Sequence, residues 1–189
     1  MCEQEGFDVE NVKAMITYQK MVDQLVNLID QYKDDNDIKL KKLIDKFYER
    51  YMEADHSIRS YHSFYNQYYF ISSLFTYVCL VSVKFYDSIP DTELKDLPSK
   101  WSINNASVEY SLNQPVTLSL IIRRLRNSIA HGRFEFYKED KNIMFKFKDV
   151  NFRDRNDHIK IIIKDEEILN FTQALSYWCI TGDSSLKDF

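Results

Sequence analysis

The chain has 189 residues, a formal net charge of −4 and an apolar fraction of 44%, which suit a globular domain rather than a disordered segment. Glycine and proline each occur only 3 times, whereas phenylalanine and tyrosine each occur 13 times. So few turn residues argue against a barrel, a propeller or a many-stranded sandwich. The glycines are too far apart for a G-x-G-x-x-G motif or a P-loop: they are Gly6, Gly132 and Gly182.

The first half of the chain shows a helical pattern of apolar residues. It predicts a long amphipathic helix over 9–29, a second helical element over 38–52 and a third helix over 58–86, with Pro90 after its end. The third segment contains the apolar run 69–83, which has the length to be tested as a membrane span. Its many small polar side chains and the lack of a basic flank favour a buried helix of a bundle instead.

Residues 88–114 hold two of the three prolines and many short polar side chains, so they predict a long connection with one short helical turn. Pro115 is expected at the first position of a fourth helix, with Asn113 or Gln114 near its cap. Gly132 stands where a glycine usually follows the C-terminus of a helix.

After this glycine, the spacing of apolar residues changes from helical to alternating. The alternation predicts a hairpin with a polar turn at 138–142, then a third strand over 159–163, and Asp165 is expected to cap a last helix. The sequence therefore predicts a mainly α fold, an up-and-down helical bundle with a small C-terminal antiparallel β-hairpin or sheet appendage and a final helix. We expect a single domain over 1–189, with a helical core at about 8–132 and the hairpin and last helix at about 133–180.

The cysteines and the N-terminus bear on the compartment. Cys2, Cys79 and Cys179 are widely spaced and form no C-x-x-C pair, which argues against a zinc site and fits reduced thiols in a cytoplasmic protein. The segment 1–10 is acidic and lacks an apolar core, so no signal peptide is expected.

The charge distribution is more informative than the net charge. Residues 110–134 contain no Asp or Glu and four arginines, a charge of +4 that leaves −8 for the rest of the chain. A local positive site on an acidic body suits a specific contact with an anion better than the coating of a polymer. The alternative is a chance cluster on a solvated helix face. The arginines are Arg123, Arg124, Arg126 and Arg133.

The segment 123–133 combines the side chains that a phosphodiester reaction needs. Arginine matches the geometry of phosphate, histidine exchanges protons near neutral pH, and asparagine orients its neighbours. On a helix, Asn127 and His131 share one face with Arg124, whereas Arg126 lies roughly 140° away from His131. A site that uses both Arg126 and His131 is easier to assemble when a second copy of the helix faces the first, which predicts a composite site at a two-fold interface. The alternative is that the histidine is an ordinary helix cap and the arginines are solvated.

The string 125–134, Leu-Arg-Asn-Ser-Ile-Ala-His-Gly-Arg-Phe, closely resembles the signature of the HEPN superfamily, an Arg followed by a polar residue, a short spacer and a His. The hairpin after it, the run Phe152-Arg153-Asp154-Arg155, the Ile-rich strand and the last helix resemble a bacterial subfamily of small stand-alone HEPN nucleases. The resemblance implies an all-helical up-and-down bundle that is often dimeric. It also implies a metal-independent endoribonuclease without a cofactor, typically with the motifs of both protomers at the dimer cleft.

Carried over to this chain, the resemblance implies that Arg126 binds the phosphate and that Asn127 positions the reacting groups. His131 would act as the base on the ribose 2′-hydroxyl or as the acid on the leaving oxygen. The expected products are a 2′,3′-cyclic phosphate and a 5′-hydroxyl. The place of the other arginines on and after this helix makes them auxiliary candidates for substrate binding, independently of the resemblance: they are Arg123, Arg124 and Arg133.

The resemblance further implies a toxin- or defence-type effector with an RNA substrate, a homodimer and an antitoxin or regulatory protein as partner. Some HEPN toxins carry a Tyr two residues after the His, which their antitoxin modifies. Arg133 occupies that position here, so this mode of control is not carried over. Two alternatives remain open. One is a non-catalytic HEPN module that binds RNA, a nucleotide or a protein partner, and the other is a structural helical module in which Arg126 and His131 only cap and pair.

Overall fold

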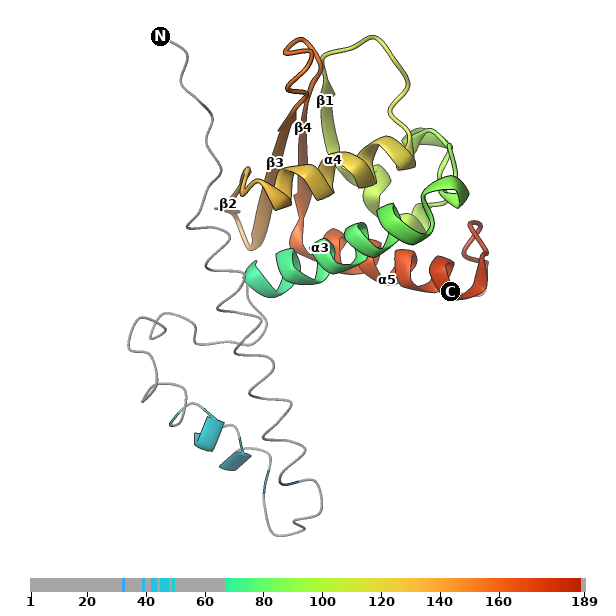
Figure 1. Ribbon diagram of the computed structural model, residues 1–189. Helices are drawn as coiled ribbons and strands as arrows, with labels where there is room; N and C mark the ends of the chain where they lie inside the picture. The colour runs from blue at the N-terminus through green and yellow to red at the C-terminus, as the bar shows by residue number, and fades with distance from the viewer. Residues whose placement is uncertain are drawn as a thin grey trace, which may run out of the picture.

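The computed structural model describes residues 67–187 continuously and a few positions between 32 and 49. The predicted helices at 9–29 and 38–52 therefore lie largely outside the described residues, as does the start of the third predicted helix. The α-helices described in full are α3 (Gln67–Lys84), α4 (Leu118–Ala130) and α5 (Asp165–Thr181), and the strands are β1 (Ser107–Tyr110), β2 (Phe134–Glu139), β3 (Asn142–Val150) and β4 (His158–Lys164) (Figure 1).

The four strands form one antiparallel sheet in the order β1-β4-β3-β2. Helix α4 lies across β3 and packs against it, α5 contacts β3 and β4, and α3 packs against both α4 and α5 (Figure 1). The prediction of a mainly α bundle with a small β appendage is therefore wrong: the sheet is central and the fold is mixed α/β. The reason is that the sheet and the helices share one apolar core, to which each described helix and the strands β2, β3 and β4 contribute buried side chains.

The sheet has one apolar face because its side chains alternate. Phe147 pairs with Phe134 on one side and with Ile161 on the other, and the next row on the same face pairs Phe145 with Ile163. All five side chains are at most 4% exposed. The opposite face is charged, and Glu135 there forms ion pairs with Lys146 and Lys148.

The segment 88–114 is not only a connection. It contains short 3₁₀ turns and the edge strand β1, in which Val108 pairs with Ile161 and Tyr110 with Ile159. This strand has four residues, and its two inward-facing side chains are only half-buried. Alternation over so short a stretch is not distinguishable from a loop in the sequence.

The helix boundaries follow from their caps. Helix α4 begins at Leu118, three residues after the predicted Pro115, because the side chain of Thr117 accepts a hydrogen bond from the backbone N–H of Leu120 at 3.3 Å. Helix α5 begins at Asp165. The side chain of Glu167 accepts a hydrogen bond at 3.2 Å from the backbone N–H of Lys164, the residue before the helix. The apolar segment of α3 lies in the core through one face, and no helix in the described part of the chain has the length and hydropathy of a membrane span.

Candidate active site on helix α4

An open pocket of about 340 Å³ lies between α4 and the loop 151–157, which joins β3 to β4. Helix α4 supplies four side chains at the spacing of one helical face, and these are all residues that the sequence predicts for the site. They are Arg123, Arg124, Asn127 and His131. The strand β3 and the loop supply the remainder of the lining: Asp149, Val150, Asn151, Phe152, Arg153 and Asp157. Arg126 and Arg133 are not among the lining residues.

The end of α4 is fixed to the sheet, which sets the place of His131. Gly132 adopts a left-handed conformation with φ of +67°, and the next residue then begins the turn into β2. Ser128, which is buried, accepts a bond from the backbone N–H of Lys148 at 3.1 Å and donates one to the carbonyl of Arg133 at 2.7 Å. His131 is therefore held at the junction of helix and sheet, half-buried at the pocket.

Arg124 is an anchor of the site and not an auxiliary group open to substrate, because it is only 3% exposed. Its guanidinium forms an ion pair with Asp149 of β3 at 2.9 Å and a second one with Asp157 of the loop. Tyr110 of β1 lies with its ring centroid 5.9 Å from the guanidinium carbon. Asn151 completes the cluster by donating to Asp157 at 3.0 Å. This cluster ties α4 to the sheet and to the loop that forms the other wall of the pocket.

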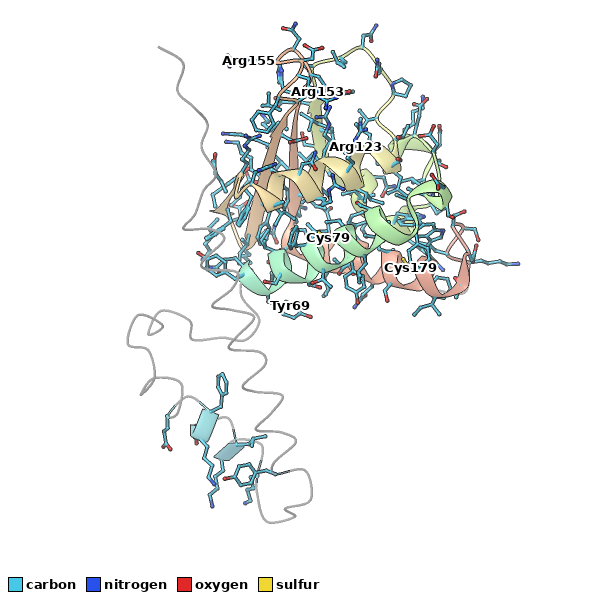
Figure 2. All side chains as sticks on the ribbon, in the orientation of Figure 1. Tyr69, Cys79, Arg123, Arg153, Arg155 and Cys179 are labelled. Carbon is cyan, nitrogen blue, oxygen red and sulfur yellow. The ribbon has the colours of Figure 1, made fainter. Side chains whose placement is uncertain are left out.

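The cluster also affects the charge of the pocket lining. The hydrogen bond from Arg124 holds the pKa of Asp157 below the ordinary aspartate value, against the opposing effect of burial. The carboxylate of Asp157 is thus ionised near neutral pH and offsets the charge of Arg124. Positive charge at the surface of the pocket comes from Arg123 on α4 and Arg153 on the loop, both exposed (Figure 2).

Arg126 points to a different side of α4. It donates from Nε at 3.2 Å and from Nη2 at 2.7 Å to Oδ1 of Asn127. Asn127 in turn donates to Asp149 at 3.4 Å. Burial raises the pKa of the Cys79 thiol on α3, and the charge of Arg126 partly offsets this. Within one chain, Arg126 thus contacts Asn127, which lines the pocket with His131, but does not itself line the pocket.

Phe152 stands beside His131 at the pocket. The two ring centroids are 5.9 Å apart with an interplanar angle of 79°, and the guanidinium carbon of Arg133 lies 4.7 Å from the Phe152 centroid. Arg133 thus contacts the pocket through Phe152 and not directly. The side chain of Phe152 is nevertheless 70% exposed.

Sequence reasoning missed the roles of Asp149, Asp157 and Phe152. For Asp149 a signal exists: it continues the inward alternation of Phe145 and Phe147, and a carboxylate at a core position needs a cationic partner. The other two residues lie in a loop, where side-chain direction does not follow from periodicity. Their place could not be found from the sequence.

The arrangement offers an imidazole, an amide and exposed guanidinium groups around one hollow, which suits the binding of a phosphate and proton transfer next to it. Among residues 67–187 and the few described before them, no three His, Cys, Asp or Glu side chains gather as ligands for a metal ion. The two cysteines in this part of the chain, Cys79 and Cys179, are free thiols (Figure 2).

A known protein family matches most of the chain. No curated protein and no solved structure matches the chain. Residues 10–186 match the family described as HEPN pEK499 p136, which covers nearly the whole length and includes every residue of the pocket. The chain belongs to this HEPN family.

Proposed function

We propose that this HEPN protein is a metal-independent endoribonuclease that cleaves RNA by attack of a ribose 2′-hydroxyl on the neighbouring phosphorus. HEPN domains include ribonucleases and nucleotide-binding modules. The observation that carries the proposal is the shared pocket of Asn127 and His131, rimmed by exposed arginines. If the motif served only to stabilise the helix, there would be no reason for an open pocket next to His131.

The reaction follows from these side chains. His131 takes the proton of the 2′-hydroxyl, the oxygen forms a bond to phosphorus, and the bond from phosphorus to the 5′-oxygen breaks. The leaving oxygen takes a proton from a general acid, which gives a 2′,3′-cyclic phosphate and a 5′-hydroxyl. Arg126 neutralises the charge that builds up on the phosphate, and Asn127 keeps the reacting groups in place. Arg123 is an auxiliary contact for a flanking phosphate.

A homodimer with the α4 helices face to face supplies what one chain lacks. Arg126 lies outside the pocket of its own chain, so a second copy could bring its Arg126 to the pocket that holds His131.

The test is a cleavage assay on single-stranded RNA in the presence of EDTA. Wild type should yield 5′-hydroxyl and 2′,3′-cyclic phosphate ends, whereas His131→Ala and Arg126→Ala should lose cleavage and keep the wild-type melting temperature. DNA of the same sequence, which lacks the 2′-hydroxyl, should stay intact. Equal RNA cleavage by wild type and both variants would refute the proposal.

We further propose that the nuclease acts as a toxin- or defence-type effector, held in check by an antitoxin or regulatory protein. The support is the resemblance of the motif and of the C-terminal half to small stand-alone HEPN nucleases. Expression of the wild type in a bacterial host should stop growth, and expression of His131→Ala should not. Equal growth with both proteins at matched levels would contradict an effector of this type.

The second candidate is a non-catalytic HEPN module that binds RNA, a nucleotide or a protein partner. One observation favours it: the pocket of a single chain is formed without Arg126. A purified protein that shifts RNA on a gel and leaves it intact, with and without added metal, would select this candidate.

A further inference from the structure

Phe152 is a large apolar side chain that the fold leaves in solvent at the edge of the candidate site. Its exposure of 70% contrasts with at most 1% for Phe145 and Phe147 on the neighbouring strand. An exposed phenylalanine gains little of the stabilisation that burial supplies, so packing does not account for its position. A role at the pocket does, since Phe152 is among the residues that line it.

The ring is nevertheless held in place. The guanidinium of Arg133 lies over it at 4.7 Å, and His131 approaches it edge to face with 5.9 Å between the centroids. Both neighbours are anchored at the end of α4, where Arg133 bonds to Ser128 through its backbone. Phe152 thus presents a preorganised aromatic surface beside the imidazole that the proposed reaction uses.

We propose that Phe152 is a stacking platform for one base of single-stranded RNA, directly beside the phosphodiester that is cleaved. The inference rests on the proposed function and names the substrate class of that site. Aromatic rings hold nucleic-acid bases by stacking, and every base offers a face for it. A base in a duplex is already stacked on its neighbours, so such a platform selects unpaired RNA.

The geometry fits a single nucleotide. The centroids of Phe152 and His131 are 5.9 Å apart, so a base on the phenyl ring would carry its own sugar to the imidazole. Arg123 and Arg153 line the same pocket from α4 and from the loop, and both are exposed to meet the flanking phosphates (Figure 2). Stacking is tolerant of sequence, so the platform predicts a preference for strandedness rather than for one particular base.

The test measures binding separately from cleavage. The probe is a fluorescein-labelled 2′-fluoro oligonucleotide, which lacks the nucleophilic hydroxyl, and the readout is fluorescence anisotropy at one fixed salt concentration. Phe152→Ala should weaken binding of the single strand by about 5- to 150-fold, the range that corresponds to replacing a stacking aromatic by alanine. Phe152→Trp should keep the affinity, and its new tryptophan fluorescence should be quenched by the RNA.

The matched control is Tyr137→Ala, which removes a half-exposed aromatic from β2 outside the pocket and should leave the affinity unchanged. The duplex form of the probe should bind wild type and Phe152→Ala alike. Equal affinity of wild type and Phe152→Ala for the single strand would overturn the platform, as would an equal loss for single strand and duplex.

The measurements distinguish a failure of the platform from a failure of the nuclease. If Phe152→Ala binds and cleaves as wild type does while His131→Ala is inactive, the platform is refuted and the nuclease stands. If Phe152→Ala loses binding and the wild type never cleaves, the platform stands and the nuclease is refuted.

Discussion

Two hollows in the described part of the chain differ in character. One is the pocket between α4 and the loop 151–157, of about 340 Å³, and the other is a groove of about 480 Å³ between α3 and α5. The groove is lined by tyrosines, small polar residues and aliphatic residues, and none of its lining residues is Asp, Glu, His, Lys or Arg: Tyr69, Ser73, Tyr77, Leu169, Thr172, Gln173, Ser176, Tyr177 and Ile180. The smaller hollow holds the arginines, the histidine and the carboxylates. The difference teaches that chemistry and not volume marks the site in this fold.

The largest effect is expected from Arg124→Ala, which should lower the stability of the fold by removing the cation of the charge cluster at the pocket. The change leaves the buried carboxylates of Asp149 and Asp157 without their cation, and loss of one partner of a buried ion pair typically costs about 3–5 kcal/mol. Urea unfolding followed by circular dichroism should show a large fall in the transition midpoint. A midpoint equal to that of wild type would mean that this cluster does not anchor α4 to the sheet.

A smaller effect should appear in the pH dependence of stability. The folded-state pKa of Asp157 is depressed, chiefly by its bond from Arg124, so its contribution is fully present above the unfolded pKa of about 4 and is lost as the pH falls through the folded value. Melting temperatures measured from pH 7 down to pH 3 should therefore show the gap between wild type and Asp157→Asn shrinking below about pH 4. A gap that stays constant over this range would contradict the assignment.

The smallest effect is expected in the groove. Gln173 is exposed on α5 and lines the groove, so Gln173→Ala should change neither RNA cleavage nor stability by more than about 0.5 kcal/mol. The measurements are the cleavage rate and the urea midpoint, next to those of His131→Ala. A loss of cleavage in Gln173→Ala would mean that the groove, rather than the pocket alone, is needed for the reaction.

The sequence was a good guide where a pattern repeats over many residues. The change of apolar spacing at Gly132 predicts the passage from α4 to the hairpin, and the strands β2, β3 and β4 lie where alternation predicts them. The face shared by Arg124, Asn127 and His131 is also confirmed, because helical spacing alone determines it.

The sequence failed where the outcome depends on tertiary contacts. Alternation identifies strands but does not say that their apolar face joins the core of the helices, so the sequence predicts an appendage where the structure has a central sheet. Arg124 and Arg123 are neighbours of the same type, and only the inward-facing Asp149 of β3 makes one of them a buried anchor and leaves the other exposed. The position of Phe152 follows from a loop conformation that has no periodic signal.

The proposed catalytic site combines residues of two chains, and a mixed dimer tests this most directly. Arg126→Ala and His131→Ala, each expected to be inactive alone, are co-expressed with different tags and purified as the heterodimer. A shared site leaves one of the two pockets with an intact Arg126 and an intact His131, which predicts about half the wild-type activity per dimer. A heterodimer as inactive as either parent would contradict the shared site.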